Sequence, residues 1–155
     1  MKNDKIREVI HSDLDSLKIV LDSCGLFPSE YLDDMISDYF HNLDTNEIWF
    51  TYVENDSPIS IGYCIPEKST SGTYNLLAIG VSENHQRKGV AVEMMNFIEQ
   101  KLKTIGARVL IVETSSDDAQ IGARNLYQKL GYNQEAVIRD FWNEGEDKIV
   151  YWKKL

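Results

Sequence analysis

Residues 107–114 read ARVLIVET, a nearly continuous apolar run that lies between two segments of helical character. A strand of this composition is typical of a sheet position that is covered on both faces. The helical segment before it, residues 88–105, ends at Gly106, and the one after it, residues 117–131, ends at Gly131. The run therefore predicts a strand inside a sheet, with helices packed against that sheet.

The rest of the chain adds strands and helices in an order that limits the fold class. Asn55, Asp56 and Ser57, between two strand-like segments, predict a hairpin. The full order is strand, helix, helix, three strands, helix, strand, helix and two strands. This order indicates a single α/β domain over residues 1–155, an α+β mixed sheet with helices on it. The other strands are expected at residues 5–10, 47–54, 58–66, 73–81, 136–142 and 148–155, and the other helices at residues 14–25 and 29–43.

Composition and charge narrow the class of partner. Hydrophobic residues make up 43% of the chain, which is enough for one core. The net charge of −9 argues against a nucleic-acid partner, because phosphate contacts need a basic surface. It is compatible with a cationic acceptor, or with a purely solubilising role. No run approaches the roughly 18 apolar residues that span a bilayer, and the N-terminus lacks the apolar core of a signal peptide, so we expect a cytoplasmic protein with no membrane partner.

The cysteines and histidines do not indicate a metal site. Cys24 and Cys64 are widely separated, and in a cytoplasmic chain both are expected to be free and buried. The chain has three histidines, and their spacing from the cysteines matches no zinc motif, so no metal is expected.

The most unusual segment is QRKGVA, residues 86–91, which joins a strand to the following helix. No proline, aspartate or serine stands directly in front of this helix, so its first N–H groups lack a side-chain partner. These donors and the helix dipole can bind an anion. Gly89 permits close backbone approach, and Arg87 and Lys88 add positive charge. The loop predicts a cradle for a phosphate or pyrophosphate, and a surface loop with ordinary capping charges is the alternative.

This loop resembles the first signature of the GNAT superfamily of N-acetyltransferases, Gln/Arg-x-x-Gly-x-Gly/Ala, with Gln86, Gly89 and Ala91 at its defined positions. ARNLYQKLGY, residues 123–132, is similar to a second signature, a helix whose tyrosine is followed by lysine, an aliphatic residue, glycine and an aromatic residue. The two motifs occur in the family's order, so the resemblance covers nearly the whole chain. It implies a mostly antiparallel, twisted sheet with helices on both faces, in which the family's fourth and fifth strands splay apart.

The resemblance implies acetyl-coenzyme A as the co-substrate. Backbone N–H groups of the loop would wrap the pyrophosphate, and the strand before it would pair with the pantetheine arm and stabilise the oxyanion. Gly80 within that strand fits a close backbone approach, although room for a neighbouring side chain is the alternative. Gln120 stands where many relatives carry an asparagine that bonds the cofactor. The cofactor-binding residues implied are Ile79, Gly80, Val81, Gln86, Arg87, Lys88, Gly89, Val90, Ala91 and Gln120.

The resemblance implies Tyr127 as the general acid that protonates the departing thiolate. A phenol with a pKa of about 10 can donate to a thiolate whose thiol has a pKa of about 8.5. An aromatic residue that packs the helix on the sheet is the alternative. Asn75 falls near the position where some relatives carry a catalytic glutamate, so Glu113, or water relayed from it, is the candidate base. A hydrogen-bonded strand-end carboxylate is the alternative for Glu113.

The predicted function is transfer of an acetyl group to a primary amine, which attacks the thioester directly. Small-molecule and peptide amines both fit. The alternative is a non-catalytic acyl-coenzyme A sensor or regulatory module, which Asn75 favours. Dimers are common in the family, so a homodimer is also compatible. Several aromatic and acidic residues are candidates for the acceptor wall, and core packing or a solvated face is the alternative for each. They are Tyr31, Asp34, Asp38, Tyr39, Phe40, Phe141 and Trp142.

Overall fold

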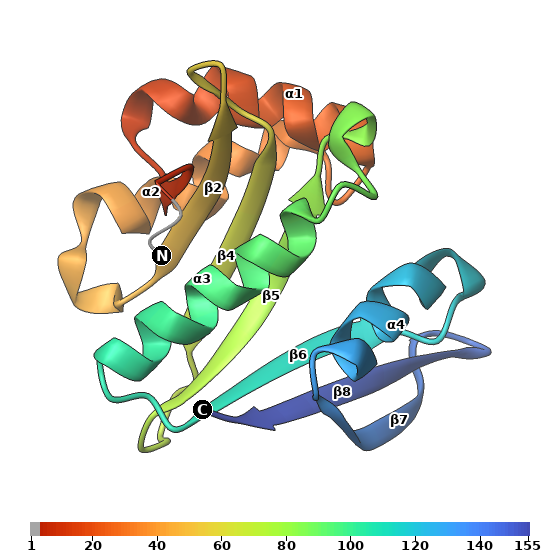
Figure 1. Ribbon diagram of the computed structural model, residues 1–155. Coiled ribbons are helices and arrows are strands. Elements are labelled where there is room, and N and C mark those ends of the chain that lie inside the picture. Colours follow the sequence, from red (N-terminus) through yellow and green to blue (C-terminus); the bar gives the residue numbers. More distant parts are fainter. Residues whose placement is uncertain (1–3) are drawn as a thin grey trace.

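The computed structural model describes residues 4–155, which form an eight-stranded sheet between layers of helices (Figure 1). Seven strands lie in the order β1-β2-β4-β5-β6-β8-β7, and the short β3 pairs with β2 beside this path. The strands are β1 Ile6–Glu8, β2 Ile48–Glu54, β3 Ser57–Pro58, β4 Ser60–Pro66, β5 Thr73–Val81, β6 Val109–Ser115, β7 Asn133–Asn143 and β8 Glu146–Lys154. The helices are α1 Leu14–Cys24, α2 Leu32–His41, α3 Val90–Thr104 and α4 Ile121–Lys129. Residues 1–3 lie outside the described residues. They belong to the predicted domain 1–155 and to the N-terminal segment considered for a signal peptide.

The predicted mixed α/β sheet is confirmed, and so is the element order, except that the strand predicted at 58–66 is divided into the short β3 and β4. β5 and β6 are parallel, and the other paired strands are antiparallel. The strand predicted at 73–81 has the same bounds in the structure. The strand predicted at 5–10 is shorter, Ile6–Glu8, because the backbone N–H of Ile10 donates to the Asp13 carboxylate at 2.9 Å and the chain turns into α1. None of the helices in residues 4–155 is both long and apolar enough to cross a membrane.

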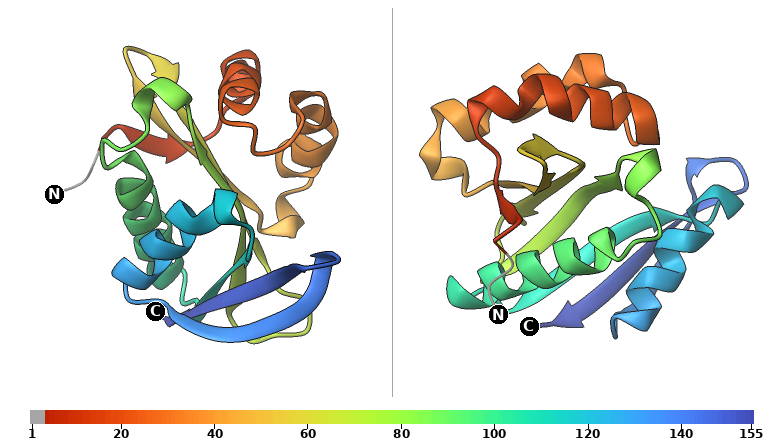
Figure 2. Two further views of the ribbon diagram at one scale, coloured as in Figure 1. Left: turned by 90° about the vertical axis from the view of Figure 1, so that its right-hand side faces the viewer. Right: turned by 45° about the horizontal axis from the view of Figure 1, so that its top comes forward.

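The sheet separates two hydrophobic cores. α1 and α2 cover one face, and α3 and α4 cover the other (Figure 2). Trp49 of β2 points toward α1 and α2, where it stacks on Tyr63 of β4 with ring centroids 3.9 Å apart. Phe50, the next residue, belongs to the core under α3 and stacks on Phe97 at 5.6 Å. Successive residues of β2 thus serve opposite cores, as expected of a strand covered on both faces.

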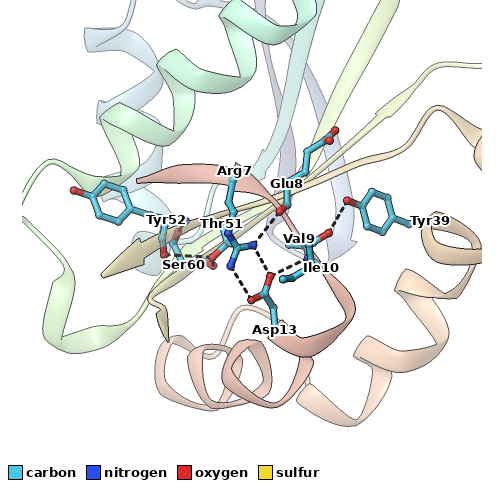
Figure 3. A network of polar contacts seen from close by, with 9 residues as sticks. All are labelled: Arg7, Glu8, Val9, Ile10, Asp13, Tyr39, Thr51, Tyr52 and Ser60. Atoms are coloured by element: carbon cyan, nitrogen blue, oxygen red, sulfur yellow. Dashed lines mark hydrogen bonds and ion pairs between the residues drawn. The ribbon is translucent and has the colours of Figure 1, made fainter. Parts of the chain in front are cut away.

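A network of polar contacts ties the edge strand β1 to the helical layer (Figure 3). The Arg7 guanidinium donates to both carboxylate oxygens of Asp13, at 2.7 and 3.0 Å, and Asp13 is buried. The Tyr39 hydroxyl of α2 donates to the Val9 carbonyl at 2.8 Å. Burial alone would raise the pKa of Asp13, but the bonds from Arg7 and from the Ile10 N–H outweigh burial and lower that pKa.

The pairing of β5 changes at Leu77. Leu76 pairs with Cys64 of β4 and Ala78 pairs with Tyr63, so Leu77 is an extra residue, a β-bulge. On its other side, β5 pairs with β6 only from Thr73 to Leu76. Beyond that point the two strands separate, which Figure 1 shows toward the end of β5. The predicted splaying of these two neighbouring strands is therefore confirmed.

We predict that Asp13→Asn lowers the free energy of unfolding at pH 7 by about 1–3 kcal/mol, because it leaves Arg7 without its charged partner. Since the folded pKa of Asp13 lies below its ordinary value, this contribution is present above the unfolded pKa of about 3.9. It is lost as the pH falls through the lower folded value. Urea unfolding of both proteins at pH 7 and pH 3 measures the effect, and a deficit of equal size at both values would contradict it. Asp33→Asn, which removes the exposed ion pair with Lys18, is the control and should change little.

Candidate active site

The separation of β5 and β6 produces a groove of about 370 Å³. One wall is the splayed part of β5, and the opposite wall comes from β6 and α4. Ile79, Gly80 and Val81, three of the predicted residues, lie in the β5 wall. Strand residues that have lost one neighbour leave backbone N–H and C=O groups without sheet partners, and a ligand with amide groups can bond to them. The groove therefore has the shape and the backbone chemistry for an extended, amide-bearing chain.

The loop at residues 86–91 forms one end of this groove. Arg87 and Gly89 adopt left-handed backbone conformations, with φ of 61° and 82°. Gly89 is the N-cap residue of α3 and has no side chain to accept from the first N–H groups of the helix. A side chain at Gly89 would point into open space, since an added Cβ would meet no atom within 4 Å. A helix N-terminus with uncapped donors and open space in front of it is suited to bind an anion.

The other predicted loop residues differ in whether they line a cavity, support the loop or lie exposed. A cavity of about 260 Å³ is lined by Arg87, Gly89, Val90 and Ala91, and Ala91 also lines the groove. Gln86 lines both, but its side-chain amide donates to the Val81 carbonyl at 3.0 Å and so fixes the loop. Lys88 is exposed at the rim.

Gly80 has a packing role that the sequence left open. An added Cβ would lie 3.0 Å from the Cys24 sulfur and 3.1 Å from Leu26 Cδ2. Cys24 is the last residue of α1, and Leu26 lies in the turn that follows it. The glycine therefore makes room for these two side chains, and both of them line the groove. Cys64 is buried as expected, whereas the expectation of burial is wrong for Cys24, which is partly exposed at the groove; both thiols are free.

Tyr127 of α4 lines the groove and is only 3% exposed. Its ring lies between those of Tyr132 and Tyr151, with centroids 6.0 and 5.4 Å away. Burial, followed by the neighbouring Tyr151, raises the pKa of Tyr127 above its ordinary value. The hydroxyl is therefore protonated throughout the neutral pH range, although the same shift makes it a weaker acid than a phenol in water.

A second cavity, of about 420 Å³, adjoins the groove. The two share four residues, Leu26, Glu113, Thr114 and Gln120. Glu113 pairs with Lys148 of β8 at 3.0 Å, so its carboxylate is held at the junction. A small molecule in the second cavity would thus meet a chain laid in the groove beside Glu113.

An irregular part of β7 builds the outer wall of this second cavity. The pairing between β7 and β8 is interrupted between Ile138 and Asn143. The intervening Trp142 lines the cavity, and its Nε1–H donates to the Thr114 carbonyl at 3.3 Å. The Lys148 ammonium lies over the Phe141 ring, 4.2 Å from its centroid, so this segment is also tied to the Glu113 ion pair.

Several residues considered from the sequence lie away from the groove. Asn75 is buried on β5, donates from Nδ2 to Glu67 at 2.8 Å, and is not part of the groove wall, which begins one residue later at Leu76. Tyr39 and Phe40 line a separate cavity near β1 and the end of α2. This position supports core packing, rather than the acceptor wall, as the role of these two residues.

The sequence did not predict that Leu26, Thr114 and Lys148 belong to the site. It also did not predict the hydrogen bond that anchors Trp142. Gly25 ends α1 in the left-handed conformation, and this signal identifies the turn that brings Leu26 to the groove. The pairing of Lys148 with Glu113 depends on the register between β6 and β8, which no local pattern encodes.

Comparison with known proteins agrees with this geometry. The model of the acetyltransferase (GNAT) family matches residues 15–132. The uncharacterised N-acetyltransferase YvbK of Bacillus subtilis (strain 168) is 27% identical over 84 residues, which cover 54% of this chain and 53% of that protein. The chain thus matches about half the length of this relative.

Solved structures share the fold across nearly the whole chain. A GNAT-family protein from Desulfovibrio desulfuricans superposes with a TM-score of 0.89 at 24% identity, covering 96% of this chain and 97% of that one. The ribosomal-protein-S18-alanine N-acetyltransferase from Escherichia coli gives 0.77 at 18% identity, with coverages of 96% and 92%. An aminoglycoside 6'-N-acetyltransferase complexed with coenzyme A gives 0.77 at 16%, with 96% of both chains covered. Because the family model spans well over half of the sequence, the protein belongs to the GNAT family of acetyltransferases.

Proposed function

We propose that the protein transfers an acetyl group from acetyl-coenzyme A to a primary amine. The observation that carries this proposal is the continuous path from the uncapped N-terminus of α3, along the splayed β5 and past Tyr127, to a second cavity at Glu113. An elongated phosphorylated co-substrate fits the first part of the path, and an amine fits the second.

The residues present suit acetyl-coenzyme A at each point. The N–H groups after Gly89 and the side chain of Arg87 would hold the pyrophosphate. Backbone groups of Ile79, Gly80 and Val81 would bond the pantetheine amides. Gln120, which is exposed at the junction, has an amide that can reach the same arm. Acetyl-coenzyme A supplies the activated acetyl group.

Three protein groups carry the proposed chemistry. Glu113, directly or through water, accepts the proton that the ammonium form of the acceptor must lose before it attacks the carbonyl carbon. A backbone N–H of β5 stabilises the negative charge that develops on the carbonyl oxygen as the new C–N bond forms. Tyr127 donates its proton to the sulfur as the C–S bond breaks, so the products are an acetamide and a neutral thiol.

The acceptor is proposed to occupy the cavity beside Trp142. Two structural neighbours bear names that describe amine acceptors, the alanine of a ribosomal protein and an aminoglycoside. An amine, on a small molecule or a peptide, is therefore the acceptor class for this chain. A non-catalytic acyl-coenzyme A sensor is the second candidate, since Asn75 is not a base and lies away from the groove wall.

Tyr127→Phe should lower kcat by at least about tenfold, because the departing thiolate loses its proton donor. The KM for acetyl-coenzyme A should stay within about twofold, since the ring remains in place. Thiol release from acetyl-coenzyme A with a panel of amines measures both values. Tyr52→Phe, at a tyrosine of β2 that lines neither the groove nor the second cavity, is the control. Turnover at the wild-type rate in Tyr127→Phe would remove the role assigned to Tyr127, and binding without turnover by the wild type would favour the sensor.

Gly89→Leu should weaken coenzyme A binding by at least about tenfold, because its side chain would enter the space in front of the helix N-terminus. Gly106→Leu is the matched control, since Gly106 follows the same helix, has a similar φ of 84° and likewise has open space around it. Both variants carry a backbone strain of roughly 1–2 kcal/mol. Calorimetric titration with coenzyme A tests the prediction, which equal affinities of the two variants would contradict.

Acetyl-coenzyme A should slow the alkylation of Cys24 by iodoacetamide, because this thiol lines the proposed pantetheine groove. Cys64 is buried and should react only after unfolding, so it is an internal control in the same sample. Peptide mass spectrometry over time measures the two rates. An unchanged rate at Cys24 with saturating acetyl-coenzyme A would place the co-substrate elsewhere.

A further inference from the structure

An ion pair between a buried carboxylate and a partly exposed ammonium joins α3 to β8, on the face of the sheet that α3 and α4 cover. Glu99 of α3 is 5% exposed, and its carboxylate lies 2.5 Å from the Lys153 ammonium. The Lys153 side chain is partly exposed, so water screens part of the attraction, while burial of the Glu99 carboxylate costs free energy. Net stability is therefore a weak reason for this pair, and its geometry points to another role.

The Lys153 ammonium makes two further contacts. It donates to the carbonyl of Leu130 at 2.8 Å, and Leu130 is the C-cap residue of α4. It also lies over the Tyr132 ring, 5.1 Å from the centroid. One cation thus holds three separate parts of the molecule, which are α3, the end of α4 and the turn that follows α4.

These contacts lead directly to the proposed proton donor. Leu130 and Tyr127 belong to the same final turn of α4. The Tyr132 backbone N–H donates to the Tyr127 carbonyl at 3.0 Å, and the two rings are in contact. At its other end, α3 begins at Gly89, where the pyrophosphate is proposed to bind. The ion pair therefore connects the helix that holds the phosphates to the helix that carries Tyr127.

We propose that Glu99 and Lys153 are positioning residues, which set the Tyr127 hydroxyl relative to the sulfur of the bound co-substrate. This inference rests on the proposed function, because it assumes that Tyr127 is the proton donor. A displacement of about 1 Å at a reacting group can cost about a hundredfold in rate, so a rigid link between the two helices matters for catalysis.

The first test is Lys153→Met, which removes the charge and keeps a similar side-chain length. We expect kcat to fall by at least about tenfold and the KM for acetyl-coenzyme A to stay within about twofold. Lys153→Arg, which keeps the positive charge beside Glu99 and a donor for the Leu130 carbonyl, should recover most of kcat. Lys101→Met is the matched control, since Lys101 of α3 forms a partly exposed ion pair with Glu8 at 3.0 Å.

A double variant separates positioning from stability. Glu99→Met with Lys153→Met replaces the pair by apolar side chains and should restore the melting temperature, because no unpaired charge stays buried. Its kcat should remain low, since the Leu130 carbonyl has still lost its donor. Recovery of kcat together with the melting temperature would overturn the inference and leave the pair a purely structural role.

A mutant cycle tests whether the pair acts through Tyr127. On the Tyr127→Phe background, Lys153→Met should lower kcat by less than about twofold, since groups that act as a unit are not additive. A full additional loss would overturn the inference while the role of Tyr127 itself stands. A wild-type protein that turns over no amine would instead refute the proposed function, and the inference with it.

Discussion

The extra residue in β5, Leu77, is the constraint on which the rest of the site depends. Before it, β5 is an ordinary member of the sheet, with partners on both sides. After it, β5 keeps its bonds to β4 but has left β6, so its remaining backbone groups face a groove. Backbone polar groups require partners, and here a neighbouring strand does not supply them, so they are open to a ligand. The same separation leaves Glu113 of β6 and the end of β5 on opposite sides of one groove.

β8 organises the charges around this opening. Two of its three lysines, Lys148 and Lys153, point to opposite faces of the sheet and pair with carboxylates from different elements. Lys148 holds Glu113 at the junction of the two cavities, and Lys153 holds Glu99 beneath α4. A single strand thus fixes groups on both sides of the sheet, at the proposed acceptor cavity and near the proposed proton donor. In a chain with a net charge of −9, these cations are placed against particular acids instead of forming a general basic surface.

Local patterns were sufficient for much of the fold and for part of the site. Three features can each be recognised within a short stretch of sequence. They are the apolar run at 107–114, the loop around Gly89 and the helix with Tyr127. The junction of the two cavities could not be predicted in this way, because it depends on which residues face one another across strands. That register is altered by the bulge at Leu77 and by the irregular segment before Asn143. The packing of Cys24 against Gly80 likewise requires the end of α1 to be placed in three dimensions.

The irregular segment of β7 also bears on how the protein behaves among copies of itself. β7 is a long edge strand whose residues are exposed throughout, including Val137 and Ile138. A straight, apolar edge is a template on which other chains can add strands and aggregate. The register of β7 shifts between Gln134 and Ala136 and again after Ile138, which leaves only short stretches of regular edge. The distortion that brings Trp142 to the second cavity therefore also protects the sheet from unwanted growth.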